Sequence, residues 1–322
     1  MSGWGPIVAA IAGLVGLAFA VACEPGEAER PPGTEASARD ERLRVFAVAY
    51  PLQYFAERIG GDAVDVRFPI PTGIDPAEWS PSAEVVAEYQ AADLVLLNGG
   101  GYAQWLERAS LSRRRLVDTS VGFRKRRLRD SGGVQHAHGP EGEHAHAGVA
   151  PMTWLDPELA IAQARAVADA LITVRPSAAV HFESGFAALE LDLRGLERRF
   201  AVAAQALGGA PLFFSHPVYP YFIRAYDLNA RSLHWEPQEV PTEAMWAEFR
   251  DALAEHPARW MLWEAAPESA SKALLERLGV RSHVFDPCAR PSESGDYLDR
   301  MRRNAEEFES LEVNRPPPSS VE

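Results

Sequence analysis

The chain has 322 residues, and 47% of them are hydrophobic, which excludes a disordered protein and allows one or two packed cores. Its formal net charge is −13 and its pI is about 5.2. Such an acidic chain has no general basic field, so we expect no nucleic-acid partner.

The N-terminus is typical of a lipoprotein signal over residues 1–23. Residues 6–22 carry no charge, and small residues stand directly before Cys23. This apolar run is shorter than the ~20 residues of a usual spanning helix, so we expect cleavage before Cys23 and lipid attachment to its thiol. Residues 24–41 would form a flexible tether. The protein would then be lipid-anchored and extracytoplasmic, in the periplasm or at the cell surface, with plain secretion or an N-terminal membrane anchor as alternatives.

Residues 42–177 are predicted to form an N-terminal β/α lobe. Alternating and β-branched patterns indicate strands, and apolar helical periodicity between them indicates helices. Strands are expected over 43–49, 64–70 and 93–97, and helices over 50–59, 82–91 and 156–174. Because the two patterns alternate, the strands should be mostly parallel.

A histidine-rich loop interrupts this lobe over residues 124–149, where the periodicity disappears. It holds His136, His138, His144 and His146 within eleven residues. Imidazole is a good ligand for zinc, copper and nickel. A mobile loop cannot hold a precise site, so we expect these histidines to form an auxiliary loop that captures metal.

The second half repeats the alternation after one long helix. The amphipathic run over 178–207 predicts a linking helix, and 208–312 predict a C-terminal β/α lobe followed by a disordered tail over 313–322. In that lobe, strands are expected over 211–214, 231–235, 260–263 and 283–285, and helices over 220–226, 243–255 and 268–278. The fold class is therefore α/β, with two β/α lobes of mostly parallel strands, one long joining helix and a metal cleft between the lobes.

Several candidate metal ligands stand where predicted strands end. These are Glu78, His216 and Asp286, and His234 and Glu264, expected near the mouth of the cleft, are further candidates. Ligand sites lie where parallel strands end at a crevice, and imidazole and carboxylate groups are zinc ligands. Each also has an ordinary interpretation: a solvated acid, a capping or turn residue, or a partner that only orients another ligand.

Catalytic motifs are missing from the sequence. It contains no G-x-G-x-x-G after a strand, no phosphate loop, no G-x-S-x-G elbow and no H-E-x-x-H. We therefore expect a binding protein, not an enzyme.

Five ordered segments carry a family resemblance over about residues 43–311. They are GIDPAEWSPS (73–82), ADLVLLNGGGYAQWL (92–106), MTWLDP (152–157), FSHPVYPYF (214–222) and YLDRMRRN (297–304). The chain resembles the solute-binding proteins of zinc and manganese ABC importers, a cluster that includes the streptococcal metal-binding adhesins. The resemblance implies capture of a divalent transition metal, zinc first and manganese second, and delivery to an ABC permease and its ATPase. We expect a monomer.

The family's ligand pattern is only half kept. The resemblance places His216 and Asp286 on the two C-lobe ligand positions, whereas the two N-lobe histidine positions hold Ala77 and Met152. Glu78, beside Ala77, could fill the vacancy. Two other functions stay open: a repurposed or adhesive lipoprotein of the same fold with a different ligand, and a metal-dependent hydrolase that uses the same acids and histidine.

Overall fold

The computed structural model describes Met1 and residues 42–71, 74, 76–77, 79–129 and 149–311, with the backbone of 136–137 and 143–144. The chain divides into two units, residues 1–40 and 41–322, and all elements named below belong to the second. None of the helices in the described ranges is long and apolar enough to cross a membrane. The predicted signal with Cys23, and Glu78, His138 and His146, lie outside the described residues.

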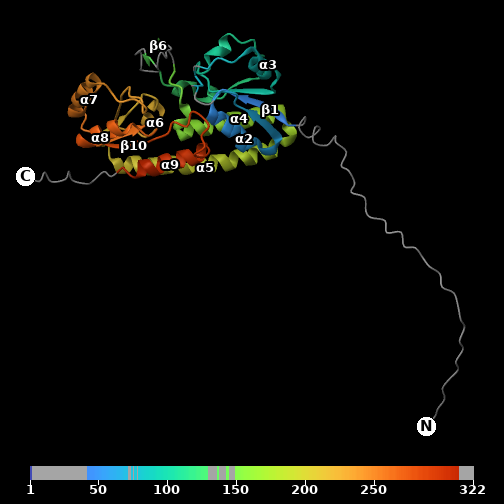
Figure 1. Cartoon of the computed structure of the whole chain (residues 1–322). Coiled ribbons are helices and arrows are strands. Elements are labelled where there is room, and N and C mark those ends of the chain that lie inside the picture. Colours follow the sequence, from blue (N-terminus) through green and yellow to red (C-terminus); the bar gives the residue numbers. More distant parts are fainter. Residues whose placement is uncertain are drawn as a thin grey trace, which may run out of the picture. The chain divides into compact units, whose positions relative to one another are not determined.

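The first sheet has four parallel strands in the order β2-β1-β3-β4. Figure 1 labels its strand β1. Its strands are β1 (Leu43–Ala47), β2 (Val64–Arg67), β3 (Leu94–Leu97) and β4 (Leu116–Asp118). Helices α2 (Tyr50–Gly60) and α3 (Ala83–Ala91) connect the first three strands, and short 3-10 helices at Gly61–Ala63 and Gln104–Glu107 lie in the connections before β2 and β4. A further 3-10 helix, Val121–Arg126, follows β4. The Ser82 side chain caps α3 by accepting from the Val85 amide, as its sequence predicted. The third crossover, to the edge strand β4, was not predicted.

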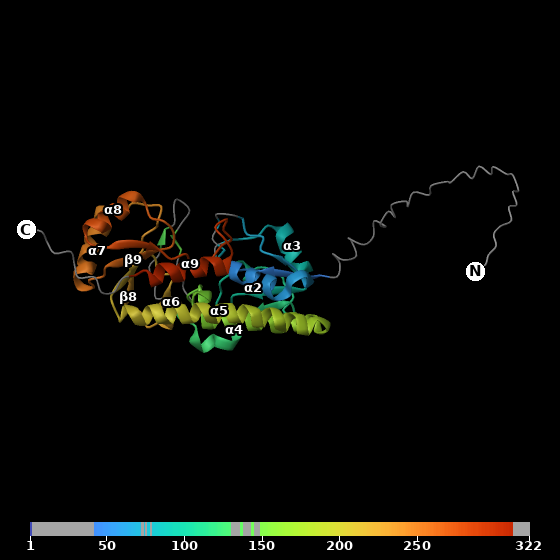
Figure 2. The ribbon, with the colours of Figure 1, turned by 90° about the horizontal axis from the view of Figure 1, so that it is seen from below.

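Two consecutive helices follow. A 3-10 turn (Thr153–Leu155) leads into α4 (Pro157–Val174), which Asp156 caps by accepting from the amides of Glu158 and Leu159. After the turn Pro176–Ala178, helix α5 spans Ala179–Leu207 and ends at Gly208, whose left-handed backbone is the usual helix stop. Figure 2 shows α5 running alongside α4 and α9, and it also packs on α2.

The second sheet also has four parallel strands, in the order β10-β9-β7-β8. Its strands are β7 (Leu212–Phe214), β8 (Ala230–Ser232), β9 (Trp260–Trp263) and β10 (Arg281–Val284). The helices are α6 (Pro220–Ala225), α7 (Glu243–Glu255), α8 (Ser269–Arg277) and α9 (Tyr297–Glu309). β8 ends earlier than predicted, but backbone pairing with the β7 segment continues, because the Trp235 amide donates to the Ser215 carbonyl at 2.8 Å.

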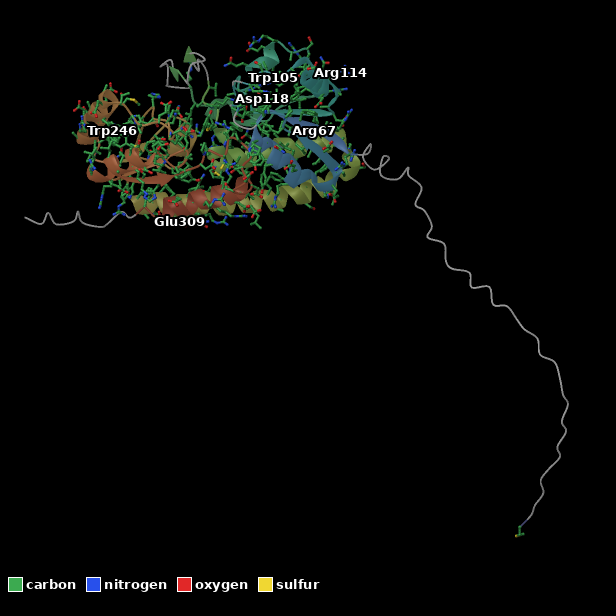
Figure 3. All side chains as sticks on the ribbon, viewed as in Figure 1. Arg67, Trp105, Arg114, Asp118, Trp246 and Glu309 are labelled. Carbon is green, nitrogen blue, oxygen red and sulfur yellow. The ribbon has the colours of Figure 1, made fainter. Side chains whose placement is uncertain are left out.

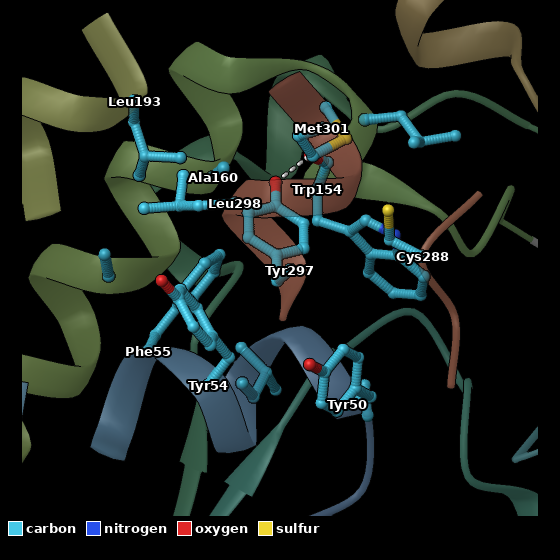
Figure 4. Close-up of a cluster of buried hydrophobic side chains, with 14 of the residues drawn as sticks. Tyr50, Tyr54, Phe55, Trp154, Ala160, Leu193, Cys288, Tyr297, Leu298 and Met301 are labelled. Atoms are coloured by element: carbon cyan, nitrogen blue, oxygen red, sulfur yellow. Dashed lines mark hydrogen bonds between the residues drawn. The ribbon is translucent and has the colours of Figure 1, made fainter. Parts of the chain in front are cut away.

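One continuous hydrophobic core includes residues of both sheets and of α5 and α9. Figure 4 shows a part of it, where the Tyr297 hydroxyl of α9 donates to the Trp154 carbonyl at 2.8 Å. A second hydrophobic cluster contains residues of the C-terminal sheet and of α7 and α8, among them Trp235, Trp246 and Trp263. Figure 3 labels Trp246. The predicted α/β class, with two mostly parallel sheets and one long helix between them in the chain, is confirmed.

Candidate metal centre

Three neighbouring strands of the second sheet place the candidate ligands. His216 follows β7, Glu236 follows β8 and Glu264 directly follows β9. Since the strands are parallel and adjacent, their carboxyl ends meet at one edge of the sheet. The order β9-β7-β8 puts His216 in the middle, so its ring can reach a residue from either side.

The His216 ring contacts both glutamates. Its Nδ1 lies 3.1 Å from Glu236 Oε1 and 3.4 Å from Glu264 Oε1. The His216 side chain is 12% exposed, against 33% for Glu236 and 22% for Glu264. A largely buried imidazole between two carboxylates is a combination of nitrogen and oxygen donors that suits a divalent transition metal.

Glu236 was missed in the sequence, where His234 was chosen from the same segment. His234 is exposed and its ring centroid lies 6.1 Å from that of His216. Trp235 between them is buried in the tryptophan cluster under the sheet, so its two neighbours in the chain face the other way. The alternation of facing along an extended segment was the signal that could have found Glu236.

Asp286 has a different environment from His216. Its carboxylate accepts from Arg300 Nε at 2.7 Å and Nη2 at 2.6 Å, and from the Cys288 amide at 2.8 Å. The Arg300 side chain is 6% exposed, so this bidentate pair is nearly closed to solvent on the arginine side. Asp286 and Glu264 are both near Tyr219. Burial raises the pKa of Tyr219, and the negative charges of these two carboxylates raise it further.

Ala77 and Met152, at the N-terminal positions that resemble family ligand sites, carry neither an imidazole nor a carboxylate. Ala77 and Met152 are partly buried and pack against the main core. Glu78, the acid expected to compensate, lies outside the described residues. The segment after Met152 is fixed to the C-terminal half, because the Trp154 indole donates to the Pro287 carbonyl at 2.8 Å.

The histidine loop is described only in part. Its backbone forms a short antiparallel pair, β5 (His136–Ala137) with β6 (Glu143–His144), in which His136 is opposite His144. The predicted loop begins inside the 3-10 helix Val121–Arg126, and Arg129 pairs with Val149 across its base. His138 and His146 lie outside the described residues. The role of the loop in capturing metal stays a prediction.

A polar cavity lies apart from the candidate ligands. It is lined by Arg126, Asp156, Glu158, Glu197, Arg224, Ala225 and Tyr226. The Asp156 carboxylate lies 3.3 Å from Arg224 and 3.5 Å from Arg126, and it also caps α4. Burial raises the pKa of Asp156 more than the two arginines and the amide of Leu159 lower it. These contacts tie α6 to the start of α4 and assign a structural role to this acid.

Within the described residues, no group of three or more His, Cys, Asp or Glu side chains is placed so that it could hold a metal ion. The His216 imidazole lies within ion-pair distance of Glu236 and of Glu264. A complete metal site would need further ligands, such as Glu78 or the loop histidines, whose side chains lie outside the described part of the chain.

The sequence matches the family model described as zinc-uptake complex component A, periplasmic, over residues 45–311. The chain is 25% identical to the zinc-binding lipoprotein AdcA of Streptococcus pneumoniae, over 82% of its own length and 55% of that protein. It is 23% identical to the high-affinity zinc uptake system protein ZnuA of Bacillus subtilis, over 84% of this chain and 87% of that protein. It thus spans about half the length of AdcA and most of ZnuA.

The fold is shared with solved structures. The Zn(II)-bound ZnuA-like domain of Streptococcus pneumoniae AdcA superposes with a TM-score of 0.72 at 21% identity, covering 85% of this chain and all of that one. With the family model spanning both sheets and the long helix between them, the chain belongs to the ZnuA family, the periplasmic component A of zinc-uptake complexes.

Proposed function

We propose that this protein captures a divalent transition metal outside the cytoplasm, zinc first and manganese second, and delivers it to an ABC permease that works with an ATPase. Family membership and the zinc-binding names of AdcA and ZnuA support this. The observation that carries it is the position of His216, a largely buried imidazole between Glu236 and Glu264 at the carboxyl edge of a parallel sheet.

In this proposal His216 is the central ligand, and carboxylates complete the shell. Glu264 and His234 are near enough to His216 to take part. Asp286 could join while Arg300 orients its carboxylate, and Glu78 is the candidate from the N-terminal half. The loop histidines would raise the local metal concentration, and a lipid on Cys23 would hold a monomeric protein at the membrane.

The two alternatives are not favoured. Membership in a family of uptake components argues against a hydrolase, and the strand-end histidine with its carboxylates argues against loss of metal binding. The replacement of the N-lobe histidines by Ala77 and Met152 is the one feature that favours a different ligand.

Zinc titration of the full chain tests the proposal. The amount of zinc that the chain binds should fall sharply in His216→Ala. It should persist in His283→Ala, a control in the same lobe whose ring pairs with the exposed Glu307. A full chain that binds neither zinc nor manganese, or a His216→Ala variant that binds zinc as the control does, would reject the function.

A further inference from the structure

We propose that two copies of this chain associate through the outer face of α5, in an antiparallel arrangement about a two-fold axis at Leu191. This association goes beyond the proposed function, which concerns a single chain and its metal, and it does not depend on that function. The monomer expected from the sequence is then the form that is present at low concentration.

The outer face of α5 carries almost no charge. The residues that face the core recur three or four positions apart along the helix, from Phe182 to Leu207. The opposite row, which we call the α5 stripe, recurs in the same way and is exposed except at the half-buried Gly195: Val180, Ser184, Ala187, Leu191, Gly195, Arg198, Val202 and Ala206. Arg198 is its one charged member. Because the exposed face of a helix is normally charged and polar, this composition indicates contact with another apolar surface.

Three large apolar side chains dominate the α5 stripe. Val180 is 82% exposed, Leu191 is 69% exposed and Val202 is 68% exposed. Leu191 stands eleven residues after Val180 and eleven before Val202. Eleven residues are close to three helical turns, so the three side chains lie on one line along the helix.

Charged residues on both sides of the α5 stripe are already paired within the chain. The pairs have N–O distances of 2.5 to 2.8 Å and are Glu183 with Arg165, Glu190 with Arg194, Asp192 with Arg58 and Arg199 with Glu309. A second copy can therefore cover the stripe without burying an unpaired charge of these flanking residues. An apolar centre with a polar rim is the usual anatomy of a protein interface.

The symmetry of the α5 stripe indicates that its occupant is a second copy. Val180 and Val202 are equally far from Leu191. An antiparallel copy therefore places each Val180 opposite Val202 of the other copy, with Leu191 opposite itself. Ala187 and Gly195, four residues on either side of Leu191, then lie opposite each other, and their small size allows the helices to approach closely.

The charged member of the stripe favours the same arrangement. Arg198 and Ser184 lie seven residues on either side of the axis, so the antiparallel pair places them opposite each other. The Ser184 hydroxyl donates to the Val180 carbonyl at 2.9 Å, and its oxygen can accept from the guanidinium of the other copy. In a parallel pair Arg198 would face Arg198, and like charges disfavour that orientation.

The size of the stripe predicts a weak and reversible dimer. α5 has 29 residues and is therefore about 43 Å long, so a contact strip about 10 Å wide covers roughly 400–500 Å² of each copy. The total, on the order of 900 Å², is below the range of about 1,200–2,000 Å² that is usual for stable interfaces. The dimer fraction should therefore depend strongly on protein concentration.

Sedimentation equilibrium of the full chain over a concentration series tests the association. The wild type should dimerise reversibly. Leu191→Glu should raise the dimer dissociation constant at least about 10-fold, because it removes the central apolar contact and places two negative charges on the axis. Val240→Glu makes a similar change at a valine outside α5 that is 52% exposed, and it should dimerise as the wild type does. Far-ultraviolet circular dichroism confirms that each variant is folded.

Oxidative cross-linking tests the antiparallel register. The background is Cys23→Ser, in which the buried Cys288 is the remaining native cysteine. Leu191→Cys should form a disulfide-linked dimer by itself, since helices about 8–10 Å apart bring facing Cα atoms within reach of a disulfide. Val180→Cys and Val202→Cys should each fail to cross-link alone, because their like positions are about 33 Å apart in the dimer, and should cross-link when the two chains are mixed.

The association is overturned if the wild type stays monomeric over the whole series, or if Leu191→Glu dimerises as Val240→Glu does. Cross-linking of Val180→Cys alone would overturn the antiparallel register. Cosedimentation of a monomeric full chain with phosphatidylglycerol vesicles, lost in Leu191→Glu, would assign the α5 stripe to a membrane surface and would also overturn the dimer.

Discussion

Replacement of Asp286 by alanine should destabilise the protein. Removing one partner of a buried ion pair costs about 3–5 kcal/mol, because the other charge stays buried without compensation. The Asp286 side chain is 30% exposed and that of Arg300 is 6% exposed, so water can reach only one side of the pair, and we expect the lower end, about 3 kcal/mol. With an unfolding entropy of roughly 0.6 kcal/mol/K for a unit of this size, Tm should fall by about 5 °C.

The assay is thermal unfolding followed by circular dichroism in the presence of a metal chelator, so that bound zinc does not contribute to Tm. Asp299→Ala, on the same helix as Arg300, is the matched control, because Asp299 pairs with Arg302 in an exposed contact worth less than about 1 kcal/mol. If Asp286→Ala lowers Tm no more than Asp299→Ala does, the ion pair between Asp286 and Arg300 does not stabilise the fold.

Two further predictions concern groups away from the metal. Burial opposes ionisation of Asp118, but hydrogen bonds from Ser120 and the charge of Arg127 outweigh it and lower the pKa of this carboxyl. The ionised form therefore stabilises the fold above the unfolded-state pKa of about 3.9, and this stabilisation is lost as pH falls through the lower folded-state pKa. In urea unfolding between pH 6 and pH 3, the stability gap between wild type and Asp118→Asn should shrink; a constant gap would contradict this. Burial also raises the pKa of the Cys288 thiol, which has no exposed surface. Peptide mass spectrometry should find Cys288 unmodified by iodoacetamide in the native protein and modified in urea, and rapid native modification would show that this turn opens.

The elements that the sequence predicted well are those with strong local patterns. Helix 243–255 and strand 260–263 agree with α7 and β9 at both ends, because their patterns are long or fully apolar. The short edge strand β4 (Leu116–Asp118) escaped prediction, since three residues are too few to show alternation. Asp156 was expected to start a helix and does so.

For the candidate site, the sequence predicts which residues follow the strands but not how their side chains pair. His216 and Glu264 follow buried strands, and parallel topology is enough to bring them to one edge. The pairing of Asp286 with Arg300 could not be read from the sequence, because it depends on how α9 packs against the end of β10. Glu236 was overlooked because His234 offered the more familiar zinc ligand two residues earlier.

The most direct test of metal capture is the zinc content and affinity of the purified full chain, compared with a chain that lacks residues 136–146. If the principal site is the His216 cluster, the shortened chain retains one tightly bound zinc with nearly unchanged affinity. Loss of that zinc together with the loop would place the site among the loop histidines and would contradict a metal centre at the edge of the C-terminal sheet.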